Sequence, residues 1–86
     1  MTSYRIEISA TAERQIRNLP RNDQIRVVRS IQTLAADPRP PGCRKLSGYD
    51  DVFRVRIGRY RALYSIEDRR LTVIVLKVGN RKDVYR

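Results

Sequence analysis

The distribution of apolar and polar positions predicts one strand, two helices and then three strands. Residues 4–8 alternate between apolar and polar side chains, which is typical of a strand with one buried face. The next segment predicts a helix that Ser9 or Thr11 caps and Pro20 ends. Its apolar residues share one stripe, which consists of Ala12, Ile16 and Leu19.

A second helix is predicted after Pro20, with Asn22 or Asp23 as its cap. We expect an inward stripe that consists of Ile25, Val28, Ile31, Leu34 and Ala35. The segment DPRPPGC at residues 37–43 ends this helix, because three prolines and a glycine cannot continue it. The cations that flank this loop are interpreted as solvated loop charge: Arg39, Arg44 and Lys45.

Three strands are predicted after the loop, over residues 52–57, 60–67 and 71–78. The last one is apolar on both faces, so we expect it inside the sheet. The order β-α-α-β-β-β predicts an α+β fold and a single domain over residues 1–86, with two N-terminal helices on one face of a small antiparallel sheet. The helices joined by NLPRND could instead form a helix-turn-helix, but the sheet needs them as its cover.

The stretch VFRVRIGRYRALYSI at residues 52–66 predicts which side chains share a face. Gly58 and Arg59 fit a two-residue type II′ turn, and such a turn fixes the register of the two strands. One face is then apolar and suits a core: Phe53, Val55, Ile57, Tyr60, Ala62, Tyr64 and Ile66. The other face carries three cations, with two of them directly opposite each other: Arg54, Arg56 and Arg61.

Like charges directly opposite each other destabilise a sheet, so the three arginines require an explanation. One interpretation is a solvated face whose charges are paired by carboxylates from elsewhere. The other is an anion site in which three guanidinium groups converge on a polyanion. The C-terminal VGNRKDVYR favours the second, because we expect Arg81 to join the cluster. Tyr85 could then stack on a base or transfer a proton, or it could only anchor the terminus.

The composition limits the binding partners and the kinds of catalytic site that we expect. The net charge is +10 and 16 of the 19 cations are arginine, which favours a phosphate-rich partner. With no histidine and one cysteine, Cys43, a metal site or a Ser-His or Cys-His catalytic pair is not expected. The unpaired cysteine fits a reducing cytosol, and we expect a cytoplasmic protein. The longest apolar run, LTVIVL, is too short for a membrane span, and the start of the chain does not resemble a signal peptide.

Three features together resemble the RelE/ParE toxin family of bacterial toxin–antitoxin pairs. They are the β-α-α-β-β-β order, the block KLSGYDDVFRVRIGRYRALYSI at residues 45–66, and the terminal VGNRKDVYR. The resemblance covers nearly the whole chain. In that family the RelE branch cuts messenger RNA in the ribosomal A site, and the ParE branch poisons DNA gyrase.

The resemblance implies a catalytic set that consists of Arg54, Arg56, Arg61, Arg81 and Tyr85. We also expect RNA contacts from Arg54, Arg56, Arg59, Lys82 and Arg86. The cations of the Pro-rich loop could touch ribosomal RNA too, although solvated loop charge is the favoured interpretation for Arg39, Arg44 and Lys45. The family has lysines where this chain has Arg54 and Arg56, and arginine is a worse general base because its pKa lies above about 12. ParE-type chains generally lack the full set, so the RelE branch is favoured.

What the resemblance implies is a ribosome-dependent mRNA endoribonuclease that uses no metal or cofactor. Its partners would be the ribosome, messenger RNA and a cognate antitoxin, whose acidic segment or helix wraps the toxin in a hetero-oligomer. Two alternatives remain open from the residues: a ParE-type gyrase inhibitor without nuclease activity, and a non-catalytic nucleic-acid-binding module.

Overall fold

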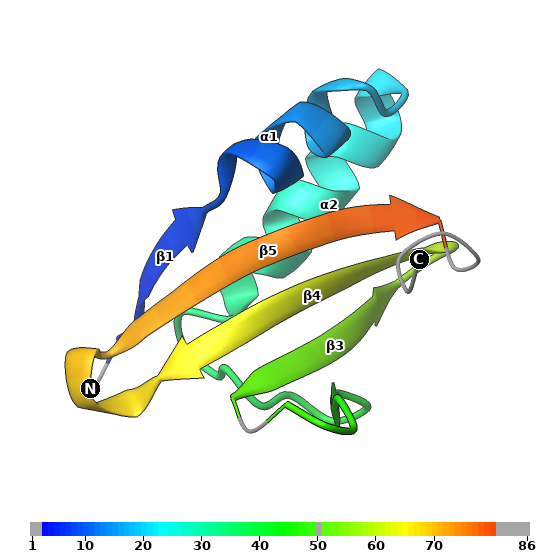
Figure 1. Cartoon of the computed structure of the whole chain (residues 1–86). Helices are drawn as coiled ribbons and strands as arrows, with labels where there is room; N and C mark the ends of the chain where they lie inside the picture. The colour runs from blue at the N-terminus through cyan, green and yellow to red at the C-terminus, as the bar shows by residue number, and fades with distance from the viewer. Residues whose placement is uncertain (1–2, 50, 81–86) are drawn as a thin grey trace.

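The computed structural model describes residues 3–49 and 51–80, with two helices on one face of a sheet (Figure 1). The elements are β1 (Arg5–Ile8), α1 (Ala10–Arg17), α2 (Arg21–Thr33), β2 (Arg44–Lys45), β3 (Val52–Ile57), β4 (Tyr60–Glu67), a 3₁₀ turn (Asp68–Arg70) and β5 (Thr72–Asn80). The strands lie in the order β1-β5-β4-β3-β2. This arrangement confirms the α+β class and the two N-terminal helices. Within the described residues, neither helix is long and apolar enough to cross a membrane.

The sheet differs from the predicted antiparallel meander at both edges. β1 pairs with β5 in parallel, so the sheet is mixed. A parallel pair needs a long crossover, and here the chain from α1 to β4 supplies it. β2 pairs antiparallel with β3, and its two residues are too few to show the alternation by which a strand is predicted. β5 lies between β1 and β4, as its apolar faces predict.

The two helices begin differently from each other. Ser9 caps α1, since its Oγ accepts a hydrogen bond from the backbone N–H of Ala12 at 3.0 Å. The prediction that Asn22 or Asp23 caps α2 is wrong, because the helix already begins at Arg21. Pro20 holds the N-cap position with no side-chain hydrogen bond, and its backbone is extended there.

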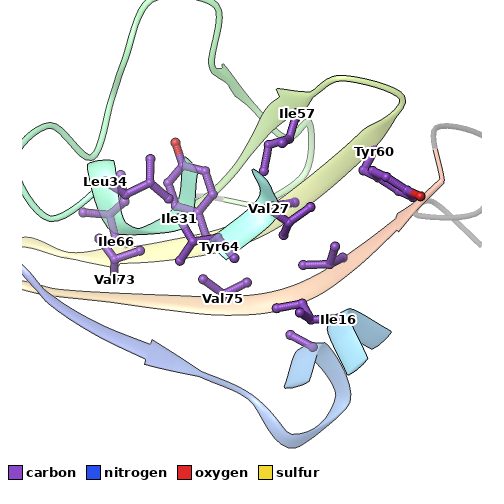
Figure 2. Packing of buried hydrophobic residues seen from close by; sticks show 13 residues of the cluster. Ile16, Val27, Ile31, Leu34, Ile57, Tyr60, Tyr64, Ile66, Val73 and Val75 are labelled. Carbon is purple, nitrogen blue, oxygen red and sulfur yellow. The ribbon is translucent and has the colours of Figure 1, made fainter. Parts of the chain in front are cut away.

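The buried stripe of α2 is not the one expected. Val27, Ile31 and Leu34 are buried, whereas the side chain of Ile25 is 47% exposed, so its inward assignment is wrong. Val28 is half-buried against the core. The helix carries two overlapping apolar stripes, and packing against the sheet selects the one that contains Val27 (Figure 2).

The sheet side of the core matches the face expected for the hairpin. Phe53 and Val55 are partly buried, and the other residues of that face are buried: Ile57, Tyr60, Ala62, Tyr64 and Ile66. β5 adds three buried valines: Val73, Val75 and Val78. The hydroxyl of the fully buried Tyr64 donates to the carbonyl of Pro38 at 2.8 Å, and burial raises the pKa of this phenol. The helices therefore cover one face and leave the arginine-bearing face open.

We expect Ile31→Ala to lower the free energy of unfolding by roughly 2–5 kcal/mol, because it leaves a cavity under the sheet. Ile25→Ala removes the same atoms from the exposed side of the same helix and should change stability by about 0.5 kcal/mol or less. Urea unfolding of both variants checks this. Equal losses in the two would contradict the stripe assignment.

Candidate functional site

The hairpin has the register that the sequence predicts. Gly58 has a positive φ of 60°, as the first position of a type II′ turn requires. Ile57 lies opposite Tyr60, and Arg56 lies opposite Arg61. Because residues opposite each other share a face, two arginines of neighbouring strands project from the open side of the sheet.

Four arginines line one hollow on that open side. The hollow has a volume of about 320 Å³, and its described lining residues are Gly42, Arg44, Arg54, Arg56 and Arg61. We call this site the arginine hollow. Strands β2, β3 and β4 each contribute, and the described lining residues include no carboxylate. Cationic side chains gathered in a concave site raise the local concentration of anions, and guanidinium forks suit phosphate oxygens.

Arg44 lines this site, although the sequence favours solvated loop charge for it over a contact with RNA. It is the first residue of β2 and lies opposite Arg54 in the register of β2 and β3. A two-residue strand after a Pro-rich loop carries almost no periodic signal. The pairing with β3 is therefore needed to recognise Arg44 as a site residue.

A second hollow, of about 600 Å³, adjoins the first, since Gly42 and Arg56 line both. Its other described lining residues are Pro41, Val55 and Gly58. Small and apolar residues thus lie next to the guanidinium group of Arg56.

Arg59 is not brought into the arginine hollow. Its Nη2 donates to Oδ2 of Asp23 at 3.1 Å, and its guanidinium lies 5.4 Å from the ring centroid of Tyr60. The hydroxyl of Tyr60 donates to the same Asp23 oxygen at 2.6 Å. These contacts fasten the hairpin tip to α2. The hydrogen bond from Tyr60, assisted by Arg59, lowers the pKa of the Asp23 carboxyl.

Four predicted site residues lie outside the described residues: Arg81, Lys82, Tyr85 and Arg86. Their roles stay predictions. The last described residues of β5, Gly79 and Asn80, lie opposite Arg61 and Tyr60. Over residues 3–49 and 51–80, no three metal-binding side chains come together.

Comparisons with known proteins agree on a family. Residues 6–85 match the family described as ParE toxin of the type II toxin–antitoxin system parDE. Toxin RelG of Mycobacterium tuberculosis is 36% identical over 87 residues, which cover 96% of this chain and 97% of that protein. The chain therefore belongs to the RelE/ParE family of toxins from type II toxin–antitoxin systems.

Solved structures support the same assignment. The RelBE2 toxin–antitoxin complex from M. tuberculosis has a TM-score of 0.84 and 32% identity, with 96% of this chain and 97% of that chain covered. The archaeal RelE–RelB complex from Pyrococcus horikoshii has a TM-score of 0.82 and 28% identity, with 98% of this chain and 100% of that chain covered. The chain is thus the toxin of a RelBE-type system, the type to which both complexes belong.

The contacts of Asp23 predict a pH dependence of stability. Because its pKa is lowered in the folded protein, the unfolded chain binds more protons in acid. The stabilisation is complete above the unfolded pKa of about 4 and is lost as the pH falls through the folded value. Asp23→Asn should therefore lower the Tm at neutral pH, and the difference from wild type should shrink toward about pH 3. Thermal unfolding across that range measures it.

The charge-matched control is Glu13→Gln, which removes an exposed carboxylate that pairs with Arg17 on α1. It should shift the Tm much less than Asp23→Asn at neutral pH. A difference between wild type and Asp23→Asn that stayed constant from neutral to acid pH would contradict the assignment.

A second expectation concerns the repulsion inside the arginine hollow. Arg56→Thr removes a cation directly opposite Arg61 and adds a good strand former, so it should raise stability by roughly 0.2–1 kcal/mol at low salt. The gain should shrink as salt screens the charges. Arg5→Thr, on exposed β1 beside Glu7, is the control and should give no such gain. Denaturant unfolding at low and high salt measures both, and destabilisation by Arg56→Thr would argue against repulsion.

Proposed function

We propose that this toxin is a ribosome-dependent endoribonuclease that cuts messenger RNA in the A site. The observation that carries the proposal is the arginine hollow, where Arg54, Arg56 and Arg61 lie together on the open face of the sheet. These are three of the five positions that the RelE resemblance assigns to catalysis. Relatives of RelE type that align over nearly the whole chain support the same branch.

The proposed reaction is a transfer within the RNA backbone. The 2′-hydroxyl attacks the adjacent phosphorus, so that an O2′–P bond forms and the P–O5′ bond breaks. The hydroxyl proton goes to a base, and the departing O5′ takes up a proton. The products are a 2′,3′-cyclic phosphate and a 5′-hydroxyl, and neither a metal nor a cofactor takes part.

Arginines suit the electrostatic part of this reaction. Arg61 and Arg81 would hold the scissile phosphate and stabilise the charge that grows on its oxygens in the transition state. Arg54 or Arg56 would orient the chain and assist the leaving oxygen, and Arg44 would bind a neighbouring phosphate. An arginine remains protonated and is a poor base.

The proton of the 2′-hydroxyl therefore needs another acceptor, and Tyr85 is the candidate. Its phenol is a weak base at neutral pH, but neighbouring cations favour the phenolate. A chain without histidine should be slow on free RNA. On the ribosome, the aligned message would supply the geometry that the toxin lacks, which is catalysis by proximity.

The net positive charge of the chain would also favour binding of an inhibitory antitoxin. The similar RelBE2 and RelE–RelB structures are complexes of a toxin with its antitoxin. With a net charge of +10, this chain suits an acidic antitoxin segment that covers the sheet or wraps the helices. Such a partner would neutralise the arginine hollow in the inactive hetero-oligomer.

A gyrase-inhibiting function is the second candidate, because the family that matches residues 6–85 is described as ParE toxin. In that case the fold acts as a binding module. The arginine face would then contact gyrase or its DNA, and the phenol of Tyr85 would have no chemical role.

Primer extension on messenger RNA in a purified translation system tests the proposal. The wild type should produce discrete cuts at A-site codons. Arg61→Ala should slow cutting by about 10²-fold or more if its guanidinium stabilises transition-state charge. Tyr85→Phe keeps the aromatic ring but removes the proton acceptor, so it should also slow cutting, by roughly 10²-fold or more.

Arg69→Ala is the matched control, since it removes an exposed arginine at the turn after β4, away from the hollow. It should cut like the wild type. If the message stays uncut, translation is intact and gyrase no longer supercoils DNA, the result contradicts the nuclease and supports the gyrase inhibitor.

A further inference from the structure

The carboxylate of Asp68 joins two distant parts of the chain. Arg39 donates to it twice, from Nη1 to Oδ1 at 3.3 Å and from Nη2 to Oδ2 at 2.9 Å. The hydroxyl of Tyr4 donates to Oδ1 at 2.6 Å. The guanidinium of Arg39 also lies 5.3 Å from the ring centroid of Phe53. We call Tyr4, Arg39 and Asp68 the loop clamp, because Arg39 belongs to the Pro-rich loop.

The loop clamp lies next to a second anchor of the same loop. The carbonyl of Pro38, one residue before Arg39, accepts the hydrogen bond from the buried Tyr64. The ring of Tyr64 stacks on Phe53, with centroids 6.1 Å apart. Two consecutive loop residues are thus held to the sheet, one through its backbone and one through its side chain.

The backbone between Arg39 and Arg44 is restricted in the conformations that it can adopt. Arg44 follows Arg39 by five positions, and Pro40 and Pro41 restrict the backbone in between. The N–H of Cys43 donates to the carbonyl of Pro40 at 3.0 Å and closes a turn. The position of Arg39 therefore limits where Arg44 can lie.

Arg44 lies opposite Arg54, so the two guanidinium groups share one face of the sheet. β2 itself is only two residues long, so the loop before it also decides where Arg44 lies. Surface ion pairs add little to stability, and Arg39 and Asp68 are 46% and 57% exposed. A two-bond fork does, however, define a geometry more sharply than a single contact does.

We propose that Asp68 and Arg39 are positioning residues of the arginine hollow, which hold the Pro-rich loop so that Arg44 binds a phosphate of the polyanion beside Arg54. The inference rests on the polyanion binding that the proposed function requires, and it does not require cleavage. Asp68 acts only through Arg39 and Arg44.

Salt-dependent binding of a short single-stranded 2′-O-methyl RNA to the full chain tests this role. The probe cannot be cut, because its 2′-oxygens are blocked. Arg44→Ala should lose one phosphate contact, so the slope of log K against log salt should fall by about 0.7 in magnitude. Asp68→Asn should cause the same fall although it makes the protein more positive. The double variant should equal Arg44→Ala, since the clamp acts through that residue.

The matched control is Glu67→Gln, which removes a carboxylate next to Asp68 that pairs with Arg70 instead. It should keep the wild-type slope. Thermal unfolding shows whether each variant is folded. If Asp68→Asn does not fold, Arg39→Lys replaces it, because lysine keeps the charge but cannot form the fork.

A wild-type slope in the folded clamp variant would overturn the inference. So would a further fall of the slope when Asp68→Asn is added to Arg44→Ala. A wild type that binds with the expected slopes but cuts no message on the ribosome contradicts the proposed nuclease and supports the clamp. Cutting with unchanged slopes in the clamp variant supports the nuclease and contradicts the clamp.

Discussion

The two-residue turn at Gly58 and Arg59 is the constraint on which the rest of the structure depends. It sets the register of β3 against β4, and a shift by one residue would exchange the two faces of the hairpin. In the observed register the apolar side chains meet α2 and the arginines face outward. A side chain at Gly58 would be strained by the positive φ and would meet Arg26 at 3.4 Å. The core and the site thus depend on the same turn.

Two carboxylates each join segments of the chain by accepting hydrogen bonds from a tyrosine and an arginine. Asp23 accepts hydrogen bonds from a tyrosine hydroxyl and an arginine at the hairpin tip, and Asp68 does so at the turn after β4. In each case the arginine lies on a loop or turn rather than within a helix or strand. Neither carboxylate is among the described residues that line the arginine hollow.

The features that could be predicted from the sequence depend on residues that lie close together along the chain. Gly58 specifies the turn, and simple alternation on both sides assigns Arg54, Arg56 and Arg61 to one face. The sequence predicts Ser9 or Thr11 as the cap of α1, and the structure selects Ser9, whose partner lies three residues away. The stripe of α2 is a harder case. Ile25 and Val27 are equally apolar, and only contact with the sheet shows which of them is covered.

The positions of Arg44 and Arg39 in the fold could not be predicted from local sequence patterns. The order of the two helices and the longer strands, the hairpin and its cationic face follow from the sequence alone, because each is encoded within a few consecutive residues. The parallel pairing of β1 with β5, the short strand β2 and the contact of Arg39 with Asp68 join residues that lie far apart along the chain. Only the tertiary structure decided these, since no periodicity links residues that lie so far apart along the chain.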